Sequence, residues 1–298
     1  MKQFLLTAAI LLLLSSISPA SANKVAIQYD FDAVSPFYGD TAIVVQNKQG
    51  IPHVGLINKA GEFILPPQKQ TDITAFHEGL APIRIDQHWG MINTQGQMII
   101  PALYKKLGPF NDGLAAALEN DKWGYINTEG NWSISPRFDK AESFSEGKAA
   151  VKQYGSWGFI DTQGKWVVQT QFRESKPYSE GFAAVKTKDG WGYLDAKGQM
   201  HITPQFETVF SFSEQLALVS SNAKWWFISS DGHPISDTKY DRAMPFSEAK
   251  AVIMLDGKYG YIDKQGKTII PPHFDNAWSY KNGLARVENA GKVGYVDD

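Results

Sequence analysis

The feature that most constrains this chain is a repeat of about 34 residues that runs through almost all of it. A glycine, most often preceded by tryptophan, returns every 34 or 35 residues, with one interval of 68 that spans two periods. These glycines are Gly55, Gly90, Gly124, Gly158, Gly192, Gly260 and Gly294. Trp226 stands at the midpoint of the long interval, so the chain holds eight copies. Because a fixed period is the mark of a repeat architecture, we predict one array of eight similar units.

Three further columns of residues keep the same register. Each copy carries one alanine, at Ala42, Ala81, Ala115, Ala149, Ala183, Ala217, Ala251 and Ala285. A turn glycine recurs at Gly61, Gly96, Gly130, Gly164, Gly198, Gly232 and Gly266. An aromatic residue opens seven units, at Phe76, Phe110, Phe144, Tyr178, Phe212, Phe246 and Tyr280. Four columns in one register establish the repeat.

The content of each copy predicts β-structure. In the copy over residues 144–172, Trp157–Asp161 alternates large and small side chains, and Lys165–Gln169 is rich in β-branched and aromatic residues. Glycine or proline arrives about every ten residues, which leaves no room for the two helices of a 34-residue helical repeat. Three short strands separated by turns fit this pattern, and the alanines suit the innermost strand of a ring.

The turns and the middle strand follow simple chemistry. An Asx residue precedes a glycine by three positions, as in Asp161–Gly164, where the Asx side chain caps a type I turn and the glycine takes a positive φ. In the middle strand Trp123 and Tyr125 lie two residues apart and therefore on one face. The glycine between them lies on the other face, where another backbone is expected to approach closely.

This pattern resembles the bacterial WG (or KWG) repeat family. The residues that carry the resemblance are Lys122–Asn127 and Ser156–Asp161, with the runs Glu146–Val151 and Glu180–Val185 before the middle strands. It covers about residues 24–298 and implies a β-rich repeat scaffold, often thought propeller-like and often of unassigned function. The departures are Val54, Trp225-Trp226, Tyr259 and Val293 at the Trp-Gly position, and an insertion in the first copy.

The N-terminal sequence is typical of an export signal. A basic start at Lys2, an apolar run over residues 4–14 and the small residues Ala20-Ser21-Ala22 predict a signal peptide over residues 1–22, with cleavage after Ala22. The mature chain is then a single domain over residues 23–298, periplasmic or secreted and without a membrane span. The absence of cysteine excludes a lipoprotein, disulfides and cysteine-bound metals.

The two ends of the mature chain together make one unit. Residues 24–32 align with the third strand at residues 267–275, whereas the last copy stops after its middle strand. The sequence therefore favours a closed eight-bladed β-propeller of three-stranded repeats, in which the N-terminal strand completes the last blade. An open solenoid or superhelical array is the alternative.

No residue pattern predicts catalysis or a cofactor. The six histidines show no metal-ligand spacing, so neither a metal site nor a cofactor is expected. Acids recur once per copy at turns, which indicates turn formers rather than an acid/base pair. The loops between the first two strands differ in every copy, and variable loops on a rigid scaffold are where binding tends to occur. The candidate ligand-binding residues are Arg84, His88, Tyr154 and Trp226.

These observations support a non-enzymatic scaffold that binds a protein or peptide partner in the cell envelope. Stacking of glycan or peptidoglycan on exposed aromatics is the alternative, and a hydrolase or lyase is a third hypothesis, since fold alone does not decide function. With a net charge of −2 and no basic cluster, the chain is not expected to bind nucleic acid. A monomer is expected.

Overall fold

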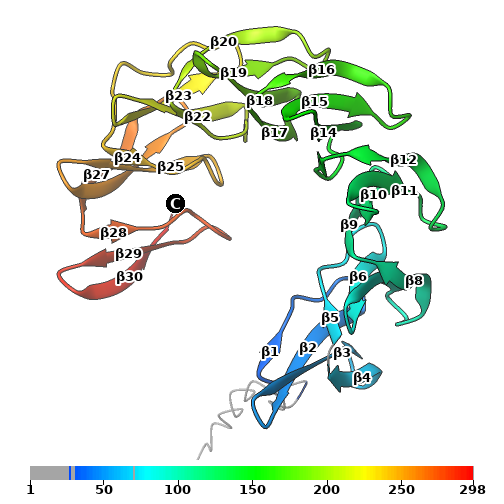
Figure 1. Ribbon diagram of the computed structural model, residues 1–298. Helices are drawn as coiled ribbons and strands as arrows, with labels where there is room; N and C mark the ends of the chain where they lie inside the picture. The colour runs from blue at the N-terminus through cyan, green and yellow to red at the C-terminus, as the bar shows by residue number, and fades with distance from the viewer. Residues whose placement is uncertain (1–26, 28–30, 70, 298) are drawn as a thin grey trace, which may run out of the picture.

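A computed structural model describes residue 27, residues 31–69 and residues 71–297. These residues form eight small antiparallel sheets and no helix, and the sheets follow one another in chain order along an arc (Figure 1). The first sheet lies at one end of the arc and the eighth at the other. The prediction of an all-β array of eight repeats is therefore confirmed. No helix in the described part is long and apolar enough to cross a bilayer.

Four kinds of strand make up the sheets, and we name them by their place. The first strands are β1 (Ala33–Val34), β5 (Thr71–Ile73), β9 (Lys106–Asn111), β13 (Lys140–Ala141), β17 (Glu174–Ser179), β21 (Thr208–Val209), β24 (Arg242–Ala243) and β28 (Asn276–Ala277). The alanine strands are β2 (Thr41–Lys48), β6 (Leu80–Ile85), β10 (Leu114–Glu119), β14 (Lys148–Gln153), β18 (Phe182–Thr187), β22 (Leu216–Ser221), β25 (Lys250–Leu255) and β29 (Ala285–Asn289). The middle strands are β3 (Ile51–Asn58), β7 (His88–Asn93), β11 (Lys122–Ile126), β15 (Ser156–Asp161), β19 (Gly190–Leu194), β23 (Lys224–Ser229), β26 (Lys258–Asp263) and β30 (Lys292–Val296). The third strands are β4 (Phe63–Lys69), β8 (Met98–Tyr104), β12 (Trp132–Phe138), β16 (Trp166–Phe172), β20 (Met200–Phe206) and β27 (Thr268–Phe274).

The first strands are absent from the sequence prediction of three-stranded units. Six of the eight sheets in the described residues have four strands, and the other two have three. The segment after each third strand pairs with the next alanine strand before it reaches the turn. In the fourth sheet the amide of Asp139 donates to the carbonyl of Lys152 at 2.8 Å, and Lys140 then pairs with Lys152. The alanine strand is therefore the second strand of its sheet and not the innermost one.

The middle-strand glycines allow the third strand to approach. A Cβ atom built on Gly124 would lie 2.4 Å from the carbonyl oxygen of Ile134 and 2.7 Å from the nitrogen of Pro136. The strand pairing shifts register at this point, between Trp123 and Tyr125. Five other middle-strand glycines show the same approach, at 2.4–2.6 Å. The predicted close approach is confirmed, and it explains why this column holds glycine.

The core lies between successive sheets. Tyr125 is fully buried, its ring centroid lies 4.7 Å from that of Phe144, and its hydroxyl donates to the carbonyl of Glu142 at 2.7 Å. It packs with Ala149 of the fourth sheet, whereas its neighbour Ile126 packs toward the second sheet. The middle strand thus presents its two faces to two different junctions, as its alternation predicts.

The predicted turn chemistry is confirmed. The Oδ1 atom of Asp161 accepts from the amides of Gln163 and Lys165 at 3.0 and 2.8 Å. Gly164 has a φ of 76°, in the left-handed region that favours glycine. The Asx residues of the second and third sheets, Asn93 and Asn127, cap their turns in the same way.

The arc in Figure 1 is open, since the first and eighth sheets lie at separate ends. No strand pairing joins these two sheets within the described residues. The sequence predicts ring closure through residues 24–32, but most of this segment lies outside the described residues, as does the predicted signal peptide. The structure therefore establishes the array of sheets and does not show closure.

Candidate functional site

The four candidate residues lie on three different sheets and do not form one site. Arg84 is on the second sheet, where its Nε donates to Asp72 at 2.7 Å and its guanidinium lies 5.8 Å from the centroid of the Trp89 ring. Tyr154 is 90% exposed at the hairpin turn of the fourth sheet, with a φ of 52°. His88 lines a surface hollow described below. The sequence therefore predicted individual residues but not which residues surround them in a shared site.

Trp226 explains why the sixth sheet has only three strands. It pairs with Val219 at the position that glycine holds in other copies, so no third strand can approach there. The segment after the turn keeps two isolated bridges to β23 and otherwise departs from it. The Trp226 ring lies 5.9 Å from the ring of Phe206, and the Lys239 ammonium lies 4.5 Å above it. Trp226 therefore fills the space of the missing strand.

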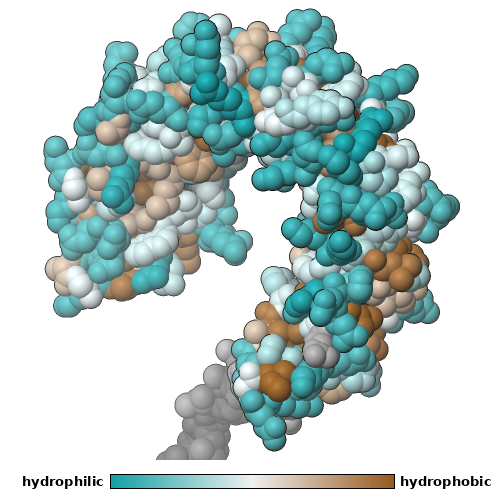
Figure 2. Space-filling view, in the orientation of Figure 1, coloured by the Kyte–Doolittle hydropathy of each residue, from teal (hydrophilic) through white to brown (hydrophobic). Residues whose placement is uncertain are grey.

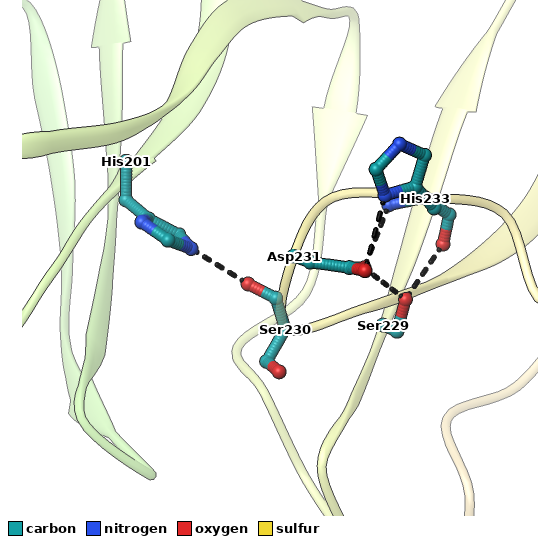
Figure 3. A network of polar contacts seen from close by, with 5 residues as sticks. All are labelled: His201, Ser229, Ser230, Asp231 and His233. Carbon is teal, nitrogen blue, oxygen red and sulfur yellow. Dashed lines mark hydrogen bonds and ion pairs between the residues drawn. The ribbon is translucent and has the colours of Figure 1, made fainter.

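A polar network at the sixth sheet holds serine, aspartate and histidine but not in a catalytic arrangement (Figure 3). Asp231 accepts from the Ser229 hydroxyl, and its other oxygen lies 3.1 Å from Nδ1 of His233. The hydrogen bond from Ser229, followed by that from the His233 amide, lowers the pKa of Asp231 to about 2. A nucleophile needs its base within hydrogen-bond reach, whereas here the hydroxyl and the imidazole both contact the carboxylate. The network caps a turn.

A neighbouring histidine belongs to the same turn. The Nε2 atom of His201, on the fifth sheet, lies 2.8 Å from the carbonyl oxygen of Ser230, and its ring lies 5.3 Å from that of Phe182 (Figure 3). Within the described residues, no group of three histidine or acidic side chains is placed to hold a metal ion. His201 thus contacts backbone and a ring, whereas His233 contacts the Asp231 carboxylate.

The recurring turn acids tie each copy to the next. In the fifth sheet, the Glu180 carboxylate accepts from the amides of Glu214 and Gln215 in the sixth, at 2.7 and 2.6 Å. The carboxylate of Glu146 accepts in the same way from the Gly181 amide at 2.9 Å. The same contact recurs from Glu78, Asp112, Glu214 and Glu248. These acids are turn residues, as predicted, and also form the polar contacts between copies.

A first surface hollow, of about 300 Å³, lies between loops of the second and third sheets. His88 lines it together with Leu103 at the end of β8 and Asn120 in the hairpin turn of the third sheet. Tyr104 contributes its ring, and its hydroxyl donates to the carbonyl of Gly130 at 3.2 Å. Burial, followed by the nearby charge of Glu119, raises the pKa of Tyr104, so this phenol stays neutral at ordinary pH. Two of the variable loops therefore meet at one concave surface.

A second hollow, of about 370 Å³, is lined by two tryptophans. Trp89 of the second sheet and Trp123 of the third are both half-buried and share this space with Lys106, Leu107 and Gly108. The hollow exists because Gly108 has no side chain. The sequence reasoning missed this residue.

Other copies fill the corresponding space. The later copies carry Glu142, Lys176, Phe210, Met244 and Trp278 at the position of Gly108. Phe210 lies 6.0 Å from the Trp225 ring, and the Lys176 ammonium lies 5.7 Å from the Trp191 ring. The two earlier copies carry Ser35 and Thr74 in this column, so Gly108 is its only residue without a side chain, and a comparison of the column would have found it.

Apolar surface gathers beside the two hollows. Three side chains of β8 are exposed: Met98 at 42%, Ile99 at 42% and Leu103 at 74%. Figure 2 shows hydrophobic surface over β8 in an otherwise largely hydrophilic arc. Scattered apolar residues are ordinary on a protein surface, but a group of them beside concave sites is typical of contact with another molecule. The junction of the second and third sheets is therefore the best candidate site.

Comparisons with known proteins agree with the repeat. A family model described as WG containing repeat matches eight segments, at residues 21–49, 55–87, 89–123, 123–156, 157–190, 191–225, 227–259 and 259–292. No curated protein matches the sequence. Among solved structures, Hsv2p of Kluyveromyces lactis is 12% identical, with a TM-score of 0.44, over 74% of this chain and 88% of that one. Dihydro-heme d1 dehydrogenase NirN, in complex with DHE, is 10% identical, with a TM-score of 0.42, over 82% and 68%.

Proposed function

Since the chain belongs to the WG-containing repeat family, we propose that it is a non-enzymatic scaffold that holds a protein or peptide partner at the junction of its second and third sheets. The observation that carries the proposal is the hollow between Trp89 and Trp123, which Gly108 leaves open. We further propose that the protein is exported, with cleavage after Ala22, and that it acts in the periplasm or outside the cell. Mass analysis of the mature protein from its native source tests the cleavage.

The chemistry of the site favours a peptide. Two half-buried indole rings and Leu107 form apolar walls, while Lys106 supplies one positive charge. Peptide grooves of this kind bind proline or apolar side chains against aromatic walls, and buried aromatic anchors supply most of the affinity. Leu103 and the other exposed side chains of β8 extend the apolar surface on which the rest of a peptide would lie.

Glycan binding is the second candidate, favoured by one observation. The two tryptophans that line a single hollow offer the aromatic faces on which sugar rings stack. A glycan also needs several polar groups to meet its hydroxyls, and Lys106 is the one charged side chain among the lining residues described. The peptide therefore remains the first choice.

The experiment is a selection followed by a titration. Peptides displayed on phage are selected on the immobilised mature protein, and peptidoglycan fragments and oligosaccharides form a second panel. Binding of each probe is then measured through intrinsic tryptophan fluorescence. Selected peptides that quench or shift the emission, with no response to the glycans, support the proposal. A response to the glycans alone would assign the site to the second candidate.

A matched pair of variants locates the binding. Gly108→Phe places a ring where Phe210 lies in the sixth copy, and a Cβ at Gly108 meets Ala116 no closer than 3.6 Å, which is an ordinary contact. Met244→Phe puts the same ring at the same position of the seventh copy. Gly108→Phe is expected to weaken peptide binding at least about tenfold, or about 1.4 kcal/mol, whereas Met244→Phe leaves it unchanged. Equal effects of the two would remove the site from this hollow.

A further inference from the structure

The outer edge of β30 is unpaired among the described residues. The corresponding edges of six other middle strands carry a third strand, but β30 pairs only with β29. Tyr295 is 70% exposed, whereas its counterparts Tyr125 and Tyr261 are fully buried because each packs on the sheet that follows it. Val293, at the tryptophan position, is 54% exposed. An open strand edge with apolar side chains is a template for pairing with another chain.

Gly294 leaves room for a third strand beside β30, and no described residue occupies that room. A Cβ at Gly294 would meet no atom within 4 Å, whereas at Gly260, one copy earlier, it would lie 2.4 Å from the carbonyl oxygen of Ile270. Glycine is required in this column because a third strand approaches closely. The eighth copy therefore has the glycine that a third strand requires, but the described residues contain no third strand beside it.

Residues near the N-terminus match a third strand that packs on the following sheet. Ile27 and Phe31 pack on Ala42 and Ile57 of the first sheet, as Ile134 and Phe138 of the third strand β12 pack on the fourth sheet. Ile27 also lies 3.2 Å from the Cβ position of the turn glycine Gly61, just as Ile134 lies 3.2 Å from that of Gly164. These two residues therefore occupy the place of a third strand that precedes the first sheet.

Asp32 shows the same equivalence in its hydrogen bonds. Its amide donates to the carbonyl of Val45 at 2.9 Å, and its carboxylate accepts from the Asn47 amide at 2.6 Å. At the end of β27, the amide of Asp275 donates at 2.8 Å and its carboxylate accepts from the Ala290 amide at 2.6 Å. Asp275 also forms an ion pair with Lys258 of its middle strand, at 2.6 Å.

We propose that β30 of one copy receives the N-terminal residues Ile27, Phe31 and Asp32 of a second copy, so that the chains join head to tail. The register follows from the seventh sheet, where Tyr259 pairs with Phe274 and Tyr261 with Ile270. The new junction places Val293 opposite Phe31 of the second copy and Tyr295 opposite its Ile27. Lys292 then pairs with Asp32, as Lys258 pairs with Asp275.

The N-terminal residues of a second copy are better placed to pair with β30 than those of the same chain. In Figure 1 the first sheet lies across the open side of the arc from β30, so closure within one chain would require the arc to bend further. A second copy brings Ile27, Phe31 and Asp32 in the positions that they already hold on the first sheet, and the new contact repeats those between successive sheets. Such a contact is heterologous, and it extends the array instead of ending it in a closed pair. The inference replaces the monomer that the sequence suggested.

Engineered cysteines test the pairing, because the native chain has none. Asp32→Cys and Lys292→Cys place thiols on residues expected to lie opposite each other, within the range that a disulfide spans. When the two single variants are mixed and oxidised, a disulfide-linked pair containing one of each is expected. The double variant is expected to give a series of linked dimers, trimers and larger species. A double variant that cross-links only within one chain would show ring closure and overturn the proposal, as would the absence of any cross-link.

A variant without cysteine tests the same contact at equilibrium. Gly294→Val adds a β-branched side chain that meets nothing within 4 Å of its Cβ in the single chain but blocks an approaching strand. Sedimentation is expected to show at least a tenfold weaker self-association. Leu103→Thr, which removes an exposed apolar side chain of β8, is the matched control and is expected to change nothing. Equal weakening by both variants would indicate general apolar contact and contradict the proposal.

Discussion

The close approach of third strands to the middle-strand glycines makes a sharp prediction about stability. Gly124→Ala and Gly294→Ala introduce the same methyl group at the same position of the repeat. At Gly124 the methyl carbon would lie 2.4 Å from one backbone oxygen and 2.7 Å from a backbone nitrogen. At Gly294 it would meet nothing within 4 Å. The two variants therefore differ only in the presence of a neighbouring strand.

The magnitude follows from this geometry. Overpacking costs about 1–3 kcal/mol, and the upper part of that range applies at Gly124 because backbone atoms cannot rotate away. Replacing glycine by alanine in a strand also gains about 0.5–1 kcal/mol through lost freedom of the unfolded chain. Gly124→Ala is expected to lower the free energy of unfolding by about 2 kcal/mol, and Gly294→Ala to raise it by about 0.5 kcal/mol.

Urea unfolding followed by tryptophan fluorescence measures both changes. The protein is kept dilute, so that any association through β30 does not contribute to stability. With a slope of about 2–3 kcal/mol per molar urea, the two midpoints are expected to differ by about 1 M. Equal midpoints would show that third-strand contact does not require glycine, and the reasoning for this column and for β30 would fail.

Three further predictions concern the polar contacts. Glu180→Ala should lower the free energy of unfolding in urea by about 1 kcal/mol, because it removes an acceptor for two amides of the next copy, while the matched Glu129→Ala changes little. Tyr125→Phe should also cost about 1 kcal/mol by loss of its buried hydrogen bond to Glu142, and an equal cost for Tyr295→Phe would contradict this. Hydrogen bonds from Lys122 and Lys258 lower the pKa of Asp139 and Asp275. Because these pKa values are lower in the folded protein, the contacts stabilise it above the unfolded value of about 3.9 and this contribution is lost as pH falls through the folded values. Lys258→Met should raise the pKa of Asp275 in an NMR titration and leave that of Asp139 unchanged.

The sequence predicts the repeated parts of the fold because each is fixed by local chemistry. Gly164 and Asp161 specify a turn by backbone conformation and side-chain capping, and both are found as predicted. Gly124 predicts the close approach of a neighbouring strand, and the structure contains that strand. Such positions recur in every copy, so the column of residues carries more information than any one copy.

The first strands of the sheets could not be predicted in the same way. β13 is two residues long, Lys140–Ala141, and it pairs because the preceding Asp139 is already hydrogen-bonded to the next alanine strand. The shape of the whole arc is harder to predict from the sequence than the strands are. It depends on a small rotation at each junction that adds up along the chain, and no single residue encodes it.

The candidate site shows where sequence reasoning fails and where it could succeed. Arg84, His88, Tyr154 and Trp226 were chosen as departures from the pattern, and only His88 lines one of the two hollows between the second and third sheets. Gly108 was overlooked because glycine is common in the chain. Its meaning appears when it is compared with Phe210 or Met244 in the same column, where a side chain occupies the space.

The most direct test of the account is an affinity capture from the native envelope with three forms of the mature protein. The wild type and Met244→Phe are expected to retain the same partner in the same amount, and Gly108→Phe is expected to lose it by at least about tenfold. All three should unfold at the same urea concentration to within about 0.3 M. A partner retained equally by all three forms would show that binding does not occur at the hollow between Trp89 and Trp123.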